Sequence, residues 1–464
     1  YNVIFTDLAD GFNPTNGIDI NGGGGADVIT VTELGNVFDQ EFDAQLGGGA
    51  DSVTFQTNTQ SLASINIAAE TTNVNVASLT TTGDQDYTGN VAIGADTELD
   101  GANVNVTGNV DGAFDLTLDG TSDVSGTVGT TVVDLTVQTG ALTAGTIDIT
   151  GNLNADQNVE TDTGAILVDG TADTEGTLIS ETGVDLGGAS DLGGDVTAQN
   201  GGATFTGAAT LTANVTIDSS ANNGNILFSS TVGTGGNDLT LNAGATGNVT
   251  VTDDLTGGGD LVVTNGATQM YDVVTVDSFD IQASATAVTF GGVVTLSANN
   301  ASGGNALKTD AAGTVTVNGA IVATAAAGLN IDIDPTDVAV NADMTATGDI
   351  DITASNDIDV AAGVTVAADS DNDGGTLTIT ADDANDADGA GDLTADTTST
   401  LSGHTVTLDG FNVTTGIVTA DTGDATITAN NEITLNGVAT AATAQVVATA
   451  TADDVNINAN VSAG

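Results

Sequence analysis

The stretch Gly348–Gly363 reads GDIDITASNDIDVAAG, and a related stretch, GDATITANNEITLNGV, follows at Gly423–Val438. Each copy opens with Gly-Asp, alternates apolar with polar residues, passes through a short corner of Asn and acidic residues, and alternates again. Because successive side chains of a β-strand point to opposite faces, each copy predicts two short strands with one apolar face. Asn and Asp suit the corner, since both tolerate left-handed backbone and bond their own main chain. The pattern predicts one side of a solenoid and its turn.

Strands of this kind recur about every ten residues from residue 65 onward. Each has an apolar–polar–apolar triplet bounded by Gly, Asn or Asp, which is a strand signal. Examples are Ile65–Ile67, Val104–Val106, Val215–Ile217, Ile331–Ile333 and Val455–Ile457. The sequence therefore predicts an all-β fold, a right-handed parallel β-helix (β-solenoid) of roughly 18–23 rungs, with Asn and Gly ladders at its corners.

Two other readings of the same spacing are weaker. An antiparallel sandwich also has a strand about every ten residues, but hairpin dipeptides and aromatic core residues are scarce here. Helix is expected at most over 319–328, which is rich in Ala.

The composition suits a stack of thin layers better than a thick globular core. Among 464 residues there are 62 Gly, 2 Pro, no Cys and no Trp, and aromatics make up 3%. The core must be built from Val, Ile, Leu, Ala and Thr, with each rung packing on its neighbours. The expected layout is a Gly-rich segment with the first rungs at 1–64 and a continuous solenoid at 65–464.

The charge balance excludes several classes of partner. The chain has 63 acidic residues and one basic residue, Lys308, for a formal net charge of −62. Nucleic acid and anionic membrane surfaces attract Lys and Arg, so we expect neither, and no apolar run is long enough for membrane insertion. Repulsion of this size must be offset by bound cations, high salt or dilution, so divalent cations are expected partners. Disorder is the alternative, but the hydrophobic residues, 39% of the chain, are regularly patterned.

Two glycine-rich turns near the start of the chain repeat one pattern. Gly22–Thr30 reads GGGGADVIT and Leu46–Thr54 reads LGGGADSVT, in which Leu46 replaces the first Gly. Both resemble the calcium-binding nonapeptide repeats of RTX proteins. The resemblance implies that Asp27 and Asp51 are calcium ligands beside the glycine carbonyls, although the copies lie roughly one full rung apart instead of about nine residues. An incidental Asp in a Gly-rich turn is the alternative.

The most specific local motif reads DSDNDG from Asp369. Carboxylates at this position, at Asp371 and at Asp373, followed by a Gly for a sharp turn, match the start of a calcium loop. Thr380 stands where an EF-hand has its bidentate Glu, and no helices flank the motif. The sequence therefore predicts a structural Ca²⁺ site in an acidic insertion loop near 369–392, with a solvated acidic loop as the alternative. Further acidic residues that could share the ion follow at Asp382, Asp383, Asp386, Asp388 and Asp392.

Other titratable residues are expected to be solvated. His404, the only histidine, has no Cys or basic partner and follows a Gly, which predicts a surface turn. Outward columns of Asp, such as Asp349 with Asp351, predict acidic faces that bind cations weakly, because neighbouring carboxylates repel unless a cation lies between them.

The phrases Gly-Asp-Ile-x-Ile-Thr-Ala, at 348–354, and Ile-Thr-Leu-Asn-Gly, at 433–437, resemble the filamentous-haemagglutinin-like and autotransporter-passenger surface proteins of bacteria. The resemblance is clearer over 200–464 than over 65–200. It implies a secreted right-handed β-helix at the cell surface, with an adhesive or structural role and no catalysis.

Three classes of function compete. The first is an extracellular structural protein, such as a subunit of a filament, sheath or biofilm matrix fibre, and the second is the shaft of a large secreted adhesin. The third is a polysaccharide-active enzyme, which could use paired Asp residues as acid and base. Acidic sugars need Lys or Arg, however, and neutral sugars usually need Trp or Tyr platforms. With no Trp, 3 Tyr and one basic residue, we expect a structural protein and no enzyme.

Both ends of the chain read as strands, which predicts head-to-tail assembly of the protein with itself. Unpaired strand edges are templates for another chain. The residues expected to take part are Tyr1, Val3, Ile4 and Phe5 at one end and Val455, Ile457 and Val461 at the other. Because the sequence begins at Tyr1 instead of Met, we also expect that a leader was removed or that the chain is a processed fragment.

Overall fold

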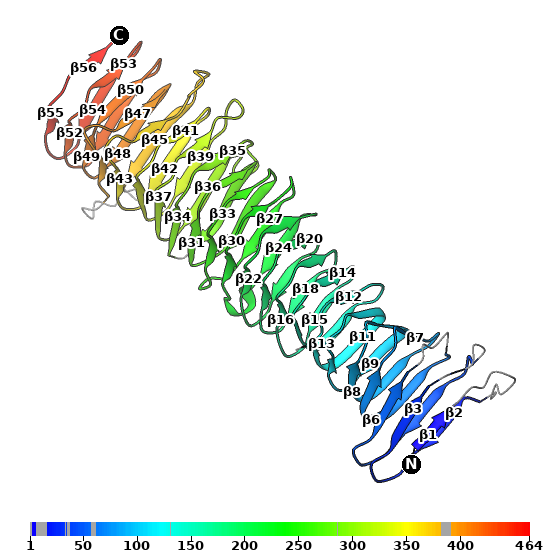
Figure 1. Ribbon diagram of the computed structural model, residues 1–464. Helices are drawn as coiled ribbons and strands as arrows, with labels where there is room; N and C mark the ends of the chain where they lie inside the picture. The colour runs from blue at the N-terminus through cyan, green and yellow to red at the C-terminus, as the bar shows by residue number, and fades with distance from the viewer. Residues whose placement is uncertain are drawn as a thin grey trace. The chain divides into compact units, whose positions relative to one another are not determined.

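The computed structural model describes residues 2–5, 16–32, 34, 38–56, 62–129, 131–284, 286–381 and 391–464. They belong to two compact units, Tyr1–Ala213 and Asn214–Gly464. Each unit is a stack of parallel strands wound as a β-solenoid (Figure 1). The two stacks together have about 21 turns, so the predicted fold class and number of rungs are confirmed.

Unit 1, residues 1–213, has three columns of parallel strands that meet at corners. The first column begins with β2 (Ile18–Asn21), β4 (Phe42–Gln45) and β6 (Ile65–Val74). The second begins with β1 (Asn2–Phe5), β3 (Val28–Val31) and β5 (Ser52–Phe55). The third begins with β7 (Ser78–Thr80) and β9 (Thr97–Val106).

Several strands of unit 1 bend around a corner and serve more than one column. They are β6, β8 (Gln85–Ile93), β9, β11 (Leu116–Gly129) and β13 (Leu142–Ile149), and the pairing register of β6, β9 and β11 shifts at the bends. The remaining strands are β10 (Val110–Asp111), β12 (Leu135–Val137), β14 (Leu153–Ala155), β15 (Val159–Thr161), β16 (Ile166–Val168), β17 (Ala172–Thr174), β18 (Leu178–Ser180), β19 (Val184–Leu186), β20 (Ser190–Leu192), β21 (Val196–Ala198), β22 (Ala203–Phe205) and β23 (Ala209–Leu211).

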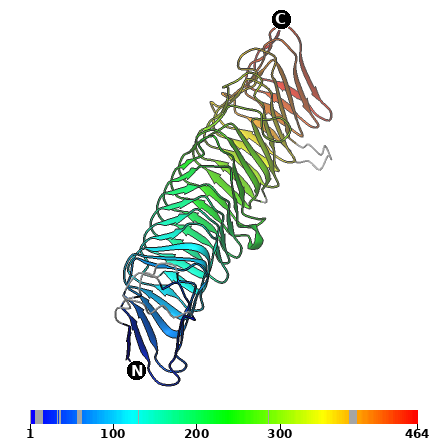
Figure 2. The same cartoon turned by 90° about the vertical axis from the view of Figure 1, so that its right-hand side faces the viewer.

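Unit 2, residues 214–464, repeats one plan of three strands per turn, and its stacked strands can be followed in Figure 2. Its first column contains β24 (Val215–Asp218), β27 (Leu239–Asn242), β30 (Asp260–Asn265), β33 (Ser278–Ser284), β36 (Leu307–Ala311), β39 (Ile331–Asp334), β42 (Ile350–Ala354), β45 (Thr376–Ala381), β48 (Thr405–Gly410), β51 (Ala425–Ala429) and β54 (Val446–Ala450). Its second column contains β25 (Ile226–Phe228), β28 (Val249–Val251), β31 (Thr268–Tyr271), β34 (Ala287–Phe290), β37 (Thr314–Val317), β40 (Asp337–Val340), β43 (Ile358–Val360), β46 (Leu393–Ala395), β49 (Val413–Thr415), β52 (Ile433–Leu435) and β55 (Val455–Ile457). Its third column contains β26 (Val232–Gly233), β29 (Leu255–Thr256), β32 (Val274–Val276), β35 (Val294–Leu296), β38 (Ile321–Ala323), β41 (Met344–Ala346), β44 (Thr365–Ala367), β47 (Thr400–Gly403), β50 (Ile417–Ala420), β53 (Ala439–Ala441) and β56 (Val461–Ala463).

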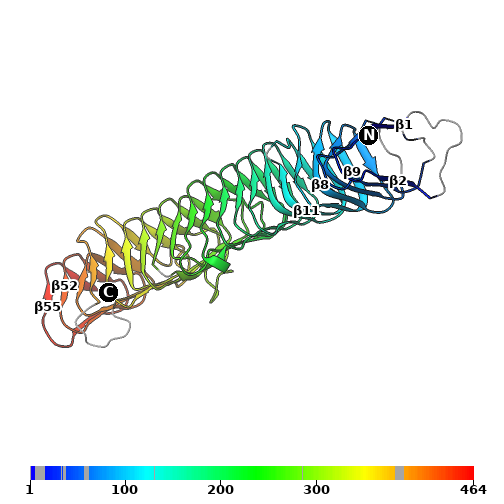
Figure 3. The ribbon, with the colours of Figure 1, turned by 90° about the horizontal axis from the view of Figure 1, so that it is seen from below.

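Helix is almost absent from the described residues, where the one helical segment is the 3₁₀ turn η1 (Ser220–Asn222) of unit 2 (green, Figure 3). The helix expected at most over 319–328 is wrong, because β38 lies within this segment. Ile321 pairs with Val294 of the preceding turn and Met344 of the next, and all three are buried core residues. Packing between turns therefore overrides the helix propensity of the Ala run.

The two related stretches occupy equivalent positions in unit 2, as their pattern predicts. The first supplies β42 and β43, and the second supplies β51 and β52. The pairing of β42 with β45, β45 with β48 and β48 with β51 places the two copies three turns apart in the same column. In both copies the inward residues are buried and the residues between them are not, as at Ile350, Asp351 and Ile352. Burying one Val, Ile or Leu side chain contributes about 1.5–3 kcal/mol, so each turn adds a few such contributions to a long, thin core.

Side-chain ladders of Asp and Asn join successive turns at the corners. In unit 2 the side-chain oxygen of Asn330 accepts a hydrogen bond from the backbone N–H of Asp349 at 2.8 Å, and Asp349 accepts one from the N–H of Thr376 at 2.7 Å. In unit 1 Asn152 accepts from Thr171 in the same way at 2.9 Å. These N–H groups lie where strands start, so the ladder satisfies donors that a corner would otherwise leave open. The predicted Asn ladders are confirmed, with Asp in the same role.

The acidic segment predicted as one insertion loop near 369–392 is interrupted by a strand. β45 lies inside it and pairs with β42 and β48, because the alternating residues of TLTITA fit the core column. Asp369–Gly375 therefore forms a corner before β45. Asp382, Asp383, Asp386 and Asp388 lie outside the described residues. Among the described residues, no helix has the length and apolar character needed to cross a membrane.

Candidate metal centre

The three predicted calcium ligands of unit 2 lie together in the corner between β44 and β45. One carboxylate oxygen from each of Asp369, Asp371 and Asp373 lies within 4.8 Å of the others. Asp369 is buried, with 4% of its surface exposed, whereas the other two are exposed. Hard cations such as Ca²⁺ take several oxygen ligands, so this donor set fits calcium.

Backbone geometry brings these carboxylates to one point. Asp369 and Asn372 have left-handed backbone, with φ of 59° and 62°, which Asp and Asn adopt more readily than most residues. The Asn372 N–H donates to the Asp369 carbonyl at 3.1 Å, and the Gly374 N–H donates to Asp369 Oδ1 at 2.8 Å. The loop is therefore a closed turn around the Asp369 side chain, with the other two carboxylates at its rim.

The electrostatics of the loop favour a bound cation. Partial desolvation, followed by the charges of Asp371 and Asp369, raises the pKa of Asp373 above its ordinary value. Carboxylates this close repel one another unless a cation lies between them. A divalent ion would relieve that repulsion.

His404 lies next to this loop, which the sequence did not indicate. Its Nδ1 is 4.0 Å from Asp369 Oδ2, and its backbone N–H donates to the Gly375 carbonyl at 2.9 Å. The ring also forms a hydrogen bond of 2.5 Å with Thr422 Oγ1 through Nδ1. His404 does lie at a corner with a partly exposed side chain, as predicted for a surface turn. The pairing of Thr376 with Thr405 brings it beside the metal loop.

The second predicted pair, Asp27 and Asp51, lies in stacked glycine turns of unit 1. The turns are one full rung apart, 24 residues, and the Asp27 N–H donates to Asp51 Oδ1 at 2.8 Å. Both Asp residues are buried, at 7% and 2% exposure. The backbones touch through a parallel bridge between Gly24 and Gly48. Gly is required at position 47, because a Cβ there would lie 1.8 Å from the Gly23 carbonyl oxygen.

A third acid, Glu70, continues this pair into the next turn and was missed by the sequence analysis. Its Oε2 accepts the Asp51 N–H at 2.6 Å, so Glu70 stands to Asp51 as Asp51 stands to Asp27. The Oδ2 atom of Asp51 is buried without a hydrogen-bond partner, which suits a carboxylate that holds a cation. Within the described part of the chain, however, three acidic side chains lie close enough to share one metal ion only in unit 2, at Asp369, Asp371 and Asp373.

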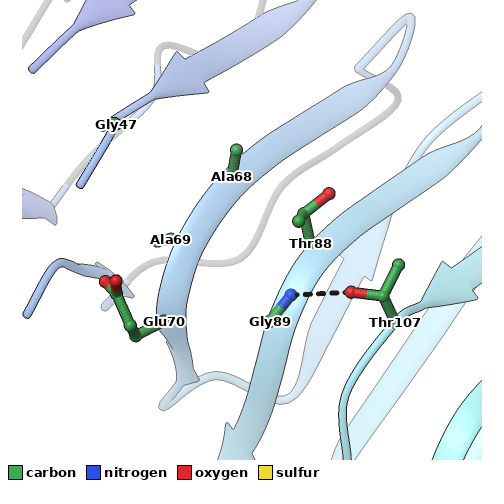
Figure 4. Close-up of a pocket in the computed structure, with 7 residues that line it drawn as sticks. All are labelled: Gly47, Ala68, Ala69, Glu70, Thr88, Gly89 and Thr107. Atoms are coloured by element: carbon green, nitrogen blue, oxygen red, sulfur yellow. Dashed lines mark hydrogen bonds between the residues drawn. The ribbon is translucent and has the colours of Figure 1, made fainter. Parts of the chain in front are cut away.

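Glu70 also borders an open hollow of about 340 Å³ on unit 1 (Figure 4). The hollow is lined by Gly47, Ala68, Ala69, Glu70, Thr88, Gly89 and Thr107. It forms where β6 and β8 shift register at the corner, and the Gly89 N–H there donates to Thr107 Oγ1 at 3.0 Å. Its polar side chains are one carboxylate and two hydroxyls, and Glu70 is exposed there.

Outward Asp residues elsewhere in unit 2 crowd together as predicted for an acidic face. Burial, followed by the charges of Asp357, Asp337 and Asp392, raises the pKa of Asp359. Asp357 and Asp392 are also ladder residues, since Asp357 accepts the N–H of Asp392 at 2.9 Å. The side chains that form the corner hydrogen bonds therefore also carry the negative charge of this face.

The predicted assembly residues that the structure describes lie on β1, β55 and β56, each of which pairs with one described strand. β1 pairs through its backbone with β3, with Val3 opposite Ile29, so residues 2–5 form a strand of the first turn. Nothing is described for Tyr1 or for the side chains of Val3, Ile4 and Phe5. At the other end Val455, Ile457 and Val461 are 38%, 54% and 42% exposed. They stack on Ile433, Leu435 and Ala439, which are buried.

Comparison with protein-family models, curated proteins and solved structures gives no match for this chain.

Proposed function

We propose that the chain is an extracellular structural protein, a calcium-stabilised subunit of a bacterial surface filament, sheath or matrix fibre that assembles end to end. The observation that carries the proposal is the continuous parallel stacking of unit 2, in which strand pairs with strand from turn to turn in each of three columns. β54, β55 and β56 each pair with one described strand, and core-column side chains of this turn are exposed. Such an edge presents unpaired N–H and C=O groups beside apolar side chains, which is a template for another strand.

The partner that fits this edge is the first turn of a second copy. β1 and β2 of unit 1 also pair with one described strand each. Ile18 and Ile20 of β2 are partly exposed. A parallel stack continues across such a joint without a change of hydrogen-bond pattern, and burying each exposed Val or Ile would contribute up to about 1.5–3 kcal/mol. A head-to-tail contact that does not close gives an open fibre.

Calcium has three roles in this proposal. At Asp369, Asp371 and Asp373 it would fix a corner, and at the Asp27 and Asp51 turns it would stabilise the first rungs. It would also lower the repulsion that a net charge of −62 imposes on a fibre, since bound cations offset like charges. Secretion to the cell surface is part of the proposal because calcium is plentiful there and no nucleic acid or membrane partner suits so acidic a chain.

A pair of matched variants tests the assembly. Ile457→Asp places a charge in a core column of the last turn and should abolish fibres, whereas Val447→Asp, on the outer face of the same turn, should leave them intact. Sedimentation velocity and negative-stain imaging, with and without calcium, measure the outcome. Fibres that survive Ile457→Asp would rule out the last turn as the joint.

The alternative proposal is that the chain is part of the shaft of a large secreted adhesin. In that case further turns of the same longer protein would cover the exposed edge. The isolated chain would then stay monomeric with calcium at high concentration, and both variants would behave alike. Binding of the monomer to glycans or host cells would favour this alternative.

A further inference from the structure

Lys308, the only basic residue of the chain, lies on the first strand column of unit 2. Acidic residues occupy the equivalent positions on the adjacent turns. The position of Lys308 on β36 pairs with Asp280 on the preceding turn and with Asp332 on the next. Asp351 follows one turn further on. The neighbours of Lys308 in the stack are therefore all acidic.

The ammonium group of Lys308 bridges two turns. Nζ lies 2.9 Å from Asp310 Oδ1 on its own strand and 2.9 Å from Asp332 Oδ2 on the next turn. The side chain is 17% exposed. Asn305 Nδ2 adds a third contact, a hydrogen bond of 3.1 Å to the same Asp332 oxygen. Two carboxylates are thus already arranged around a single positive charge.

The pKa shifts of Lys308 and Asp351 agree with an ammonium group held among carboxylates. Burial alone would lower the pKa of Lys308, but the hydrogen bonds and charges of Asp310 and Asp332 outweigh it and raise that pKa. The pKa of Asp351 is raised by burial and by the charges of Asp332 and Asp349, and Lys308 opposes that rise. Without the ammonium, these carboxylates would face one another uncompensated.

We infer that the Lys308 ammonium occupies a cation-binding position formed by Asp310 and Asp332, and that a divalent metal ion takes this position when the ammonium is removed. Carboxylate oxygens are the ligands that hard cations prefer, and here an ammonium already holds two of them at ion-pair distance. Lys308 is thus a built-in counter-ion. The inference does not depend on calcium binding at Asp369.

A loop beside Lys308 fixes the position. Residues 300–305 include a small antiparallel bridge between Ala301 and Asn305, and side chains of this segment reach acids on three turns. Asn300 Nδ2 donates to Asp260 Oδ1 at 3.0 Å, Ser302 Oγ donates to Asp280 Oδ2 at 2.6 Å, and Asn305 contacts Asp332. Asp332 is held by Asn305 as well as by Lys308, and Asp260 and Asp280 are held by the loop, so these three carboxylates should keep their arrangement when the lysine changes.

The test compares Lys308→Met with Lys308→Arg in the full chain, in a background that carries Asp371→Asn and Asp373→Asn. This background removes the loop site, so failure of calcium at Asp369 and failure of the present inference give different results. Calcium titration calorimetry at low ionic strength should find about one more bound ion for Lys308→Met than for the background, and no gain for Lys308→Arg. Adding Asp332→Asn to Lys308→Met should remove the gain. Equal stoichiometry in Lys308→Met and the background would overturn the inference.

The unmodified chain provides a second measurement, which does not depend on how a variant folds. Because the counter-ion is covalent, amide hydrogen exchange of β36 and β39 should be unchanged when a chelator is added at low ionic strength. Loss of protection in these two strands on chelation would mean that a free cation, and not Lys308, holds this column together.

Discussion

Replacing Gly47 with alanine should loosen the first turns of unit 1. Gly47 has a left-handed backbone, with φ of +86°, and an added Cβ would lie 1.8 Å from the Gly23 carbonyl oxygen. The left-handed backbone alone costs a non-glycine residue about 1–2 kcal/mol. Relief of the clash requires the two turns to separate.

Separation would break the hydrogen bonds that join the glycine turns. The Gly25 N–H donates to the Gly48 carbonyl at 2.8 Å, and the Gly48 N–H donates to the Gly23 carbonyl at 3.2 Å. Each contributes about 1 kcal/mol. Together with the backbone cost, the local free energy of opening should fall by about 3–4 kcal/mol.

Gly24→Ala is the matched control. An added Cβ at Gly24 has nothing within 4 Å, and Gly24 is not among the residues with positive φ. Alanine there should change the free energy of opening by only a few tenths of a kcal/mol, as an exposed substitution does.

Amide hydrogen exchange with mass spectrometry measures both variants. Exchange over residues 18–55 should be roughly a hundred- to a thousand-fold faster in Gly47→Ala, since about 1.4 kcal/mol corresponds to a factor of ten. Unit 2 should be unaffected, because each turn of a solenoid contacts only its neighbours. Unchanged exchange in Gly47→Ala, or equal acceleration in both variants, would refute the close-approach argument.

Three further outcomes can be checked on the same material. Asp371→Ala with Asp373→Ala should lower the number of bound calcium ions without unfolding unit 2, and chelator at low ionic strength should lower the melting temperature of the wild type by more than that of this variant, which keeps the Asp27 and Asp51 turns. Because desolvation and neighbouring charges raise the pKa of Asp373 above the ordinary aspartate value of 3.8, the calcium-free folded state binds protons that the unfolded chain has released. Its resistance to urea should therefore increase as the pH falls through the range just above 3.8, and Asp373→Asn should remove that part of the increase. Trypsin has one site in the chain, after Lys308, inside a strand paired on both sides; the native protein should resist cleavage, and unfolding should yield two fragments at a rate that reports opening of β36.

The sequence predicted what depends on local alternation. Ile350 and Ile352 face inward because a strand has a period of two, and Asn356 lies at a corner because Asn suits one. Contacts between turns were harder to predict, since they depend on turn length. The spacing is 24 residues from Asp27 to Asp51 but 19 from Asp51 to Glu70.

Glu70 and His404 were missed for this reason. Extending the first glycine spacing would place the third acid near Asn75 instead of Glu70. His404 meets Asp369 only because β45 separates two acidic segments and sets the register of Thr376 with Thr405. The Asp369 motif itself was found because its ligands are close in sequence, so their approach does not depend on the pairing register between turns. The calcium, the filament and the extracellular location remain predictions.

The corner ladder has a consequence for how such a protein evolves. Each side-chain oxygen serves the N–H of the adjacent turn, and Asp or Asn does so equally well, as at Asn330 and Asp349. A duplication or deletion of whole turns therefore leaves every remaining turn with a neighbour of the right chemistry. The two related stretches, three turns apart in the same columns, have the form that such a duplication leaves. Gene length can then change in steps of one turn, which lets selection adjust the reach of the protein while its fold stays the same.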